Sequence, residues 1–285
     1  MKYNIVKDLS ERGFNINTVI QVIEITEAED TLQIEVGKVY LFKWKQSGKY
    51  FLEEVRFYRK NLQHDLLCKC YGVEDTKILG NRKIDKLVWR TGSEAGLFLL
   101  LEYIPGKTLY DVYTDEKFRN TPECIPKIKK YISQICDALI FLQENRFMYI
   151  DLKGENIMIC QETDNIKLID FEGCYHEDDD IPQIVIGAHM FMTPEQMVSY
   201  NNVSYFTASW QLGVLLYEIV TKVNPFDTDK TYSQDNIKKR IMNIEYDKKV
   251  IKDSPFKKLI KSLLVLKPEN RLTYSQIKEY IENMP

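Results

Sequence analysis

The amino-terminal hundred residues carry the hydrophobic patterns of β-strands. Residues 18–25 are rich in β-branched side chains, and apolar and polar residues alternate over residues 32–36, which is the period of a strand with one buried face. Gly37 and Lys38 form a two-residue connection suited to a hairpin. These patterns predict strands at 18–25, 32–36, 39–44, 69–73 and 97–102, with one helix at about 50–61.

The following part of the chain has the pattern of helices. An apolar stripe with steps of three and four residues predicts an amphipathic helix, and this stripe consists of Ile125, Ile128, Ile132, Ile135, Leu139 and Leu142. Residues 207–221 are apolar on nearly every face, so they predict a helix that is buried all round. Two short strands are expected at 157–160 and 166–169. Strands followed by helices indicate an α+β fold with two lobes.

The composition is that of a globular protein and is ample for a large core. The chain has 285 residues, 44% of them hydrophobic and 28% charged. A net charge of −3 gives no field that favours nucleic acid or an anionic membrane, so neither is expected as a partner. The six cysteines and three histidines lack the spacing of a zinc site, and free thiols in a reducing compartment are expected. No apolar run resembles a secretory signal or a membrane span, which predicts a cytoplasmic protein.

The candidate chemistry is concentrated in one short segment. Asp151, Lys153 and Asn156 lie within six residues on a predicted loop. Phosphoryl transfer needs a carboxylate at the acceptor hydroxyl, an oxygen ligand for magnesium and a cation for the moving phosphate, and these three side chains supply all of them. A second carboxylate, Asp170, follows a short apolar run and precedes Phe171. The order and spacing of these residues predict a phosphoryl-transfer site.

With this loop and its second carboxylate, nearly the whole chain resembles the eukaryotic-type Ser/Thr protein kinase family. The resemblance implies a bilobal fold. Its N-lobe, at about 1–102, is a small antiparallel sheet with one helix. A hinge at about 102–106 leads to a larger, mainly helical C-lobe at about 107–285.

The resemblance also implies roles for the residues of the loop. Asp151 is then the catalytic base, and Lys153 contacts the transferred phosphate. Asn156 and Asp170 hold magnesium, so ATP and Mg are the implied cofactors. The position of Lys153, two residues after Asp151, favours Ser/Thr over Tyr as the acceptor in a protein substrate.

Two further charged residues of the family's site have candidates in the N-lobe. Lys43 matches the strand lysine of the family, with Lys45 on the same face as the alternative. Glu54 matches the helix glutamate that pairs with this lysine, and Glu53 is the alternative. The nucleotide site that the resemblance implies therefore includes a Lys43–Glu54 ion pair.

The hinge candidates follow from the same resemblance. Leu101 is the implied gatekeeper, and the backbone of Glu102 and Ile104 would meet the adenine ring. Leu41 and Met158 would lie on the two faces of this ring.

Two C-lobe features of the family are also matched. Residues 187–195 resemble the end of an activation segment, with Thr-Pro-Glu195 in place of Ala-Pro-Glu. Arg271 is expected to form a buried ion pair with Glu195. Trp210 and Gly213 fall where the central C-lobe helix of the family carries these residues.

The chain departs from the family pattern at the phosphate loop. Residues 26–31 read Thr-Glu-Ala-Glu-Asp-Thr and lie between the expected first two strands. Glycines normally let backbone N–H groups approach the phosphates at this place, and three carboxylates would repel them. We therefore expect a kinase-like fold without a glycine-rich loop and with altered nucleotide binding.

A second departure concerns regulation. Tyr149 and Ile150 replace the His-Arg that precedes the catalytic Asp in the family, and the Arg normally pairs with a phosphorylated activation loop. Tyr175 carries the only hydroxyl between residues 170 and 192. These observations argue against a switch by phosphorylation of this loop. Tyr149 can still occupy the hydrophobic spine position beneath Phe171.

Three supporting positions are also altered. Glu172 separates the Asp-Phe pair from Gly173, so the loop loses a flexible position. Ala188 replaces a threonine whose hydroxyl usually bonds the catalytic Lys and Asp. Ala208 replaces an aspartate that usually caps the backbone of the catalytic loop. These losses are expected to weaken the support of the catalytic side chains.

Two charged clusters have plainer interpretations. Residues 177–180 are all acidic and are expected to form a solvated loop rather than a metal site. The basic residues of the C-lobe are expected to be ordinary surface charges, with contact to an acidic partner as the alternative. They are Lys238, Lys239, Arg240, Lys248, Lys249, Lys257, Lys258 and Lys261.

The favoured function is therefore Mg- and ATP-dependent phosphorylation of Ser/Thr in a protein substrate, by a divergent kinase that is not switched by loop phosphorylation. The first alternative is a pseudokinase scaffold with weak or no nucleotide turnover. Further alternatives are a small-molecule phosphotransferase and a nucleotidyl transferase on the same fold. The identity of the substrate and the oligomeric state stay open.

Overall fold

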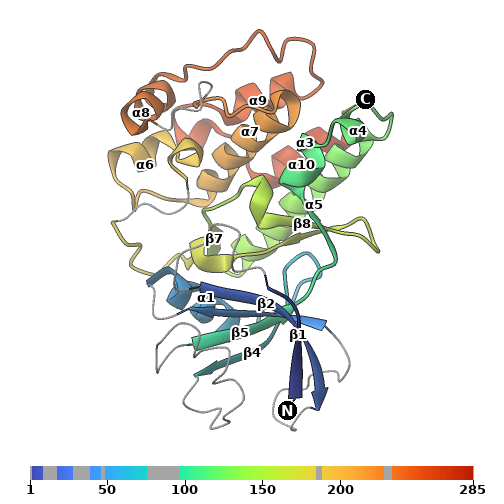
Figure 1. Ribbon diagram of the computed structural model, residues 1–285. Helices are drawn as coiled ribbons and strands as arrows, with labels where there is room; N and C mark the ends of the chain where they lie inside the picture. Colours follow the sequence, from blue (N-terminus) through green and yellow to red (C-terminus); the bar gives the residue numbers. More distant parts are fainter. Residues whose placement is uncertain are drawn as a thin grey trace. The chain divides into compact units, whose positions relative to one another are not determined.

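The computed structural model describes residues 2–8, 18–27, 39–45, 49–75, 97–183, 188–227 and 233–284. The chain forms two compact units. The first comprises Met1–Gln63 and Cys68–Pro105, and the second comprises His64–Leu67 and Gly106–Pro285. Strands dominate the described part of the first unit and helices that of the second, which confirms the predicted α+β class (Figure 1).

The first unit contains an antiparallel sheet of five strands in the order β1-β2-β3-β5-β4. The strands are β1 (Lys2–Asp8), β2 (Thr18–Glu27), β3 (Val39–Lys45), β4 (Cys70–Asp75) and β5 (Leu97–Glu102). The predicted strands that begin at residues 18, 39, 69 and 97 are confirmed to within a few residues. Their β-branched and aromatic side chains favour the pleated, half-buried surface of a sheet.

Helix α1 (Lys49–Arg59) belongs to the same unit and confirms the helix predicted at about 50–61. Val55 and Phe57 are 1% and 3% exposed. Helix α1 contacts β4. Its apolar side chains therefore cover part of the sheet.

Strand β1 changes the predicted order of strands. It pairs with β2, with Lys2 opposite Glu27 and Asp8 opposite Gln21. The first two strands are therefore joined by residues 9–17, which include Gly13. The acidic segment 26–31 instead begins at the end of β2 and leads toward β3.

The prediction that this acidic segment joins the first two strands is therefore wrong. The expectation of a missing glycine-rich loop depended on that placement and loses its basis. The expected strand at 32–36 and its hairpin at Gly37 and Lys38 lie outside the described residues. The short polar start of the chain gave no sign that it would pair with a strand about twenty residues away.

The second unit combines two small sheets with helices. Its strands pair in the orders β6-β8-β9 and β10-β7. The elements are β6 (Gly106–Thr108), α3 (Leu109–Thr114), α4 (Glu116–Arg119), α5 (Cys124–Glu144), β7 (Phe147–Tyr149), β8 (Ile157–Cys160), β9 (Ile166–Leu168), β10 (Cys174–His176), α6 (Pro194–Val198), α7 (Tyr205–Thr221), α8 (Gln234–Asn243), α9 (Lys257–Leu263) and α10 (Tyr274–Glu282).

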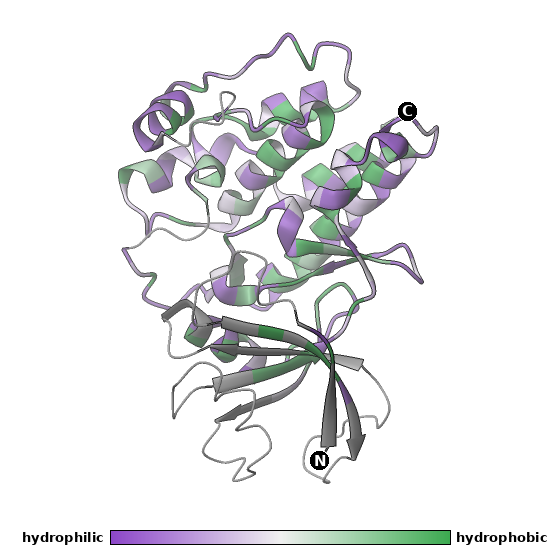
Figure 2. Ribbon diagram, viewed as in Figure 1, coloured by the Kyte–Doolittle hydropathy of each residue, from purple (hydrophilic) through white to green (hydrophobic). Residues whose placement is uncertain are grey.

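Helix α7 is the centre of this unit. Every residue from Thr207 to Ile219 is buried, which confirms the helix predicted to be buried all round. Figure 2 shows hydrophobic residues along α7 and α5. A Cβ at Gly213 would lie 2.8 Å from the Cβ of Leu263, so glycine permits the close approach of α7 and α9. Helix α7 thus gives the neighbouring segments a rigid support.

Helix α5 confirms the predicted amphipathic stripe. Of its six members, Ile128, Ile132, Ile135, Leu139 and Leu142 are at most 1% exposed. Ile125, in the first turn of α5, is 38% exposed. Among the described residues, no helix combines the length and the apolar character needed to cross a bilayer.

Candidate active site

The predicted catalytic loop lies between β7 and β8 in the second unit. It ends in a single 3-10 turn, Gly154–Asn156. A Cβ at Gly154 would lie 2.9 Å from the Tyr113 ring and 3.0 Å from the backbone nitrogen of Tyr110. Glycine is therefore needed here because the loop packs directly against the start of α3.

Three predicted site residues meet at one carboxylate. Lys153 Nζ donates to Asp151 Oδ2 over 2.7 Å. Asn156 Nδ2 donates to the same Oδ2 and to the carbonyl oxygen of Asp151, both over 2.9 Å. The side chains of Asp151 and Lys153 are 13% and 21% exposed. The carboxylate is thus fixed by two donors on one oxygen.

Burial raises the pKa of Asp151, and the opposing attraction of Lys153 does not fully cancel this rise. Burial by itself would lower the pKa of Lys153. The charge of Asp151 and its hydrogen bond outweigh burial, so the pKa of Lys153 is raised. Lys153 therefore keeps its positive charge at neutral pH. A carboxylate with a raised pKa accepts a proton more readily, as a general base requires.

The hairpin of β8 and β9 brings the two predicted magnesium ligands to one place. Ile157 is opposite Leu168, and the Ile169 N–H donates to the Asn156 carbonyl over 3.0 Å. Asn156 directly precedes β8 and Asp170 lies two residues after β9, so both residues lie at the same end of this hairpin. Both residues offer side-chain oxygens, which are the ligands that Mg²⁺ prefers. The donor set fits magnesium.

Asp170 has an unusual backbone. Its φ of 58° and ψ of 83° lie in the left-handed region, which is uncommon for a residue other than glycine. The Tyr149 hydroxyl donates to the carbonyls of Ile169 and Asp170 over 2.8 and 3.2 Å. Tyr149 therefore helps to hold the backbone that carries Asp170.

The rings of Tyr149 and Phe171 also meet edge to face. Their centroids are 5.8 Å apart and their planes lie at 77°. Both side chains are at most 1% exposed. The predicted contact between these two residues is present, and its role as a hydrophobic spine stays a prediction.

A residue that sequence reasoning missed supports the catalytic loop from α7. Gln211 Oε1 accepts the Leu152 N–H over 3.0 Å, and its Nε2 donates to the Ile150 carbonyl over 2.7 Å. These two backbone groups flank Asp151. Ala208 offers no polar side chain, but Gln211, one helical turn later on the same face, supplies the missing support. The sequence held one signal of this role: Gln211 is the single carboxamide side chain in a mostly apolar helix.

The predicted ion pair between Glu195 and Arg271 is present. Arg271 donates through two nitrogens to the two carboxylate oxygens, over 2.6 and 2.7 Å. The Arg271 side chain is fully buried, and its guanidinium lies 5.1 Å from the centre of the Trp210 ring. This pair anchors the end of the activation segment beside α7.

The acidic run at residues 177–180 is exposed, as predicted for a solvated loop. Arg146 donates to Glu177 and Asp178 over 2.5 and 2.8 Å. The Tyr205 hydroxyl also donates to Glu177, over 2.7 Å. Two of the four acids thus fasten the segment after β10 to its neighbours.

The remaining candidates lie in the first unit, apart from Met158, which is half-buried on β8. Leu41 is opposite Leu101 in the pairing of β3 with β5. The Glu102 N–H donates to the Lys69 carbonyl over 2.9 Å. Ile104 is 7% exposed. Their roles around an adenine ring stay predictions.

The two N-lobe charges are described in part. Lys43 is opposite Leu99 on β3, and the side chains of Lys43 and Lys45 lie outside the described part of the chain. Glu54 is fully buried on α1, whereas Glu53 pairs with Arg56 over 2.7 Å. The pairing of Lys43 with Glu54 stays a prediction.

Comparison with known proteins decides the family. A model of the protein kinase domain matches residues 18–281. The chain belongs to the protein kinase domain family. The matched range includes every residue of the candidate site described above.

Curated kinases resemble the chain at moderate identity. "Probable serine/threonine-protein kinase KIN1 homolog" of Enterocytozoon bieneusi is 26% identical over 279 residues, which are 98% of this chain and 42% of that protein. "Myosin light chain kinase, smooth muscle" of Gallus gallus is 28% identical over 232 residues, 78% of this chain and 12% of that protein. The chain therefore spans less than half the length of these relatives.

Proposed function

We propose that this kinase domain transfers the γ-phosphate of ATP, with magnesium, to Ser or Thr hydroxyls of a protein substrate. The observation that carries the proposal is the arrangement around Asp151. One carboxylate is held by Lys153 and Asn156 in a loop of six residues. The relatives named as Ser/Thr kinases support the same acceptor class.

The contacts of Asp151 suggest which role Asp151 and Lys153 would each have in the reaction. Both side-chain donors bind Oδ2, and within the described residues no hydrogen bond is made to Oδ1. Oδ1 is therefore the oxygen that would accept the proton of the substrate hydroxyl. Lys153 stands beside it as a charge for the moving phosphate. A binding-only domain would have no need of this arrangement.

Asn156 and Asp170 would hold magnesium. The Asn156 amide nitrogen is bound to Asp151, so its Oδ1 is the atom left to meet a cation. The Asp170 carboxylate would be the second ligand. Magnesium, when bound, neutralises charge on the phosphates.

We further propose that phosphorylation of the activation segment does not switch this kinase. Tyr175 carries the one hydroxyl between residues 170 and 192. Its side chain is 1% exposed, so the active site of another kinase could not reach this hydroxyl. Thr193 is fully buried. The ion pairs of Arg146 with Glu177 and Asp178 hold the start of the segment with charges that are always present.

The test is incubation with magnesium, γ-labelled ATP and a degenerate Ser/Thr peptide library, with the Asp151→Ala variant beside the wild type. Transfer of label to Ser or Thr that Asp151→Ala loses is the expected result. Products that carry AMP would instead identify a nucleotidyl transferase. Equal labelling by both proteins would contradict the role of Asp151.

A pseudokinase scaffold is the second candidate, and Ala188 is the observation that favours it. This position is described and carries no hydroxyl to bond the catalytic groups. A thermal-shift titration separates the two candidates, because a ligand at about 100 times its Kd stabilises the folded state by about 2.7 kcal/mol. No shift with any nucleotide and divalent metal would favour the scaffold.

A further inference from the structure

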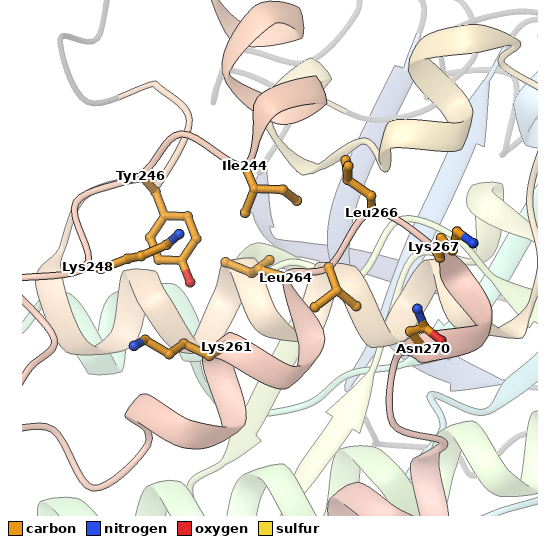
Figure 3. Close-up of a pocket in the computed structure, with 9 residues that line it drawn as sticks. Ile244, Tyr246, Lys248, Lys261, Leu264, Leu266, Lys267 and Asn270 are labelled. Carbon is orange, nitrogen blue, oxygen red and sulfur yellow. The ribbon is translucent and has the colours of Figure 1, made fainter.

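A pocket lies in the second unit, lined by none of the candidate active-site residues (Figure 3). Its volume is about 460 Å³. Apolar side chains form its floor and three lysines stand around it. The lining residues are Ile244, Tyr246, Lys248, Lys261, Leu264, Val265, Leu266, Lys267 and Asn270.

One wall of the pocket is fixed to the core. The Tyr246 ring meets the rings of Tyr217 and Phe226 edge to face, at 5.5 and 6.3 Å between centroids. Phe226 in turn stacks on Trp210 of α7 at 5.4 Å. Because this aromatic chain is anchored in the buried helix, the wall is formed before any ligand arrives.

A strained residue contributes to the pocket. Ile244 follows α8 with φ 52° and ψ 44°, the left-handed conformation in which a β-branched side chain is an outlier. The helix end itself uses only the backbone: the Ile244 and Glu245 N–H groups donate to carbonyls of the last turn. Glycine would satisfy this end without strain. The isoleucine side chain is therefore explained by the pocket it lines and not by the cap.

The pocket is apolar at its centre. Figure 3 shows Ile244 and Leu264 between Tyr246 at one end and Leu266 at the other. Leu266 is 47% exposed, so this end of the pocket presents an apolar side chain to an incoming ligand. A concave surface of this kind fits one inserted apolar side chain.

The charge around the pocket has one sign. Among the described residues, Lys248, Lys261 and Lys267 have no carboxylate partner, and the Lys248 ammonium lies 5.2 Å from the centre of the Tyr246 ring. Glu245, Asp247 and Glu269 are nearby in sequence but do not line the pocket. From 244 to 267 the chain has seven lysines and three acids, although its net charge is −3. The positive charge is thus a local feature.

We propose that this pocket docks an acidic protein segment: one Leu, Ile, Met or Phe side chain enters between Ile244 and Leu266, and flanking Asp or Glu residues meet the three lysines. The apolar hollow supplies the contact area, and the charges select the partner. A bilayer surface would use the lysines but not the hollow, so a protein segment fits better.

The experiment selects random 12-residue peptides displayed on phage against the wild-type chain. Enriched peptides are expected to carry Asp or Glu around an apolar residue and to bind Lys248→Glu/Lys261→Glu about tenfold more weakly. Lys238→Glu/Lys239→Glu changes the same charge on exposed positions of α8 outside the pocket, and should bind as the wild type does. No enrichment, or peptides without acidic residues, would overturn the proposal.

Ile244→Gly separates the pocket from the stability of the fold. Glycine adopts the left-handed conformation freely, so Tm should not fall while the affinity for the selected peptides falls. Unchanged affinity would overturn the proposal. Vesicles of phosphatidylcholine and phosphatidylserine should not bind, and binding that the double lysine variant loses would assign the site to a membrane instead.

Docking at this pocket does not depend on phosphoryl transfer. The Asp151→Ala variant is expected to bind the selected peptides as tightly as the wild type. Failure of peptide binding and failure of the proposed catalysis are thus distinguishable.

Discussion

At the scale of single residues, the site depends on side chains that fix a neighbour more than on isolated charges. Asp151 is oriented by Lys153 and Asn156, and its flanking backbone by Gln211. Such support matters because displacement of a catalytic group by about 1 Å can lower the rate of reaction about a hundredfold.

Asp170→Asn is the most specific test of the predicted role of Asp170 as a magnesium ligand. Asparagine tolerates the left-handed backbone at this position, so the change removes charge without new strain. We expect magnesium-dependent turnover to be lost while Tm is kept. Asp170→Ala should lose turnover and also about 1 kcal/mol of stability, because alanine is poorer in this conformation. Turnover by Asp170→Asn equal to the wild type would contradict the assignment.

Gln211→Leu tests the support from α7. Removal of the amide leaves the Leu152 N–H and the Ile150 carbonyl buried without this partner, at about 1–3 kcal/mol each in unfolding free energy. We expect kcat to fall with little change in the KM for ATP, measured in steady-state kinetics. Ala208→Asp in the same background should restore part of kcat.

Ser209→Ala is the matched control for this variant. Ser209 is buried on the same helix, but its hydroxyl donates to the Leu272 carbonyl, away from the loop. It should lose stability with kcat unchanged. An equal fall of kcat in both variants would show that Gln211 has only a general structural role.

At the scale of elements, buried polar groups join segments that are far apart in sequence. Helix α7 holds the catalytic loop through Gln211 and contacts α3 through Glu218, which accepts from the Tyr113 hydroxyl over 3.1 Å. Arg271 joins α6 to the turn before α10. The C-lobe is therefore organised around one helix.

Arg271→Ala should destabilise the protein strongly. It leaves the Glu195 carboxylate without its two donors in a mostly buried place, at about 3–5 kcal/mol. Urea denaturation would measure this loss. Arg271→Lys keeps the positive charge but cannot form two parallel hydrogen bonds with the carboxylate. Its free energy of unfolding should therefore lie between those of the wild type and Arg271→Ala. A loss below 1 kcal/mol, the range of a surface pair, would contradict the buried assignment.

Glu218 predicts a pH dependence of stability. Burial raises its pKa to about 7, against an unfolded value of about 4.3. Between these values the unfolded chain releases a proton that the folded chain retains, so the free energy of unfolding falls as pH rises, by roughly 3 kcal/mol. Glu218→Gln should remove this slope. Denaturation of both proteins at pH 5 and pH 7 would show it, and parallel curves would contradict it.

At the scale of the whole molecule, the proposed regulation follows from what is buried. The hydroxyls of the activation segment are enclosed, and ion pairs fix the start of that segment. Protein treated with a phosphatase should therefore keep the kcat of untreated protein in the labelled-ATP assay. A loss of activity that a kinase treatment restores would contradict this proposal.

The sequence by itself determined the class of fold and the candidate catalytic residues. Hydrophobic periods of two and about 3.6 residues are local, so the strands β2, β3, β4, β5, β8 and β9 and the helices α1, α5 and α7 could be predicted. The residues Asp151, Lys153 and Asn156 were found for the same reason, because their spacing lies within a single loop.

Only the tertiary structure decided what depends on distant pairing. The pairing of β1 with β2 joins two segments that are separated along the chain, and it overturned the prediction that residues 26–31 join the first two strands. Gln211 lies about sixty residues after the loop that it supports, and the pocket joins the end of α8 to the segment after α9. These contacts exist because folding brings distant segments together, so their meaning could not be derived from spacing along the chain.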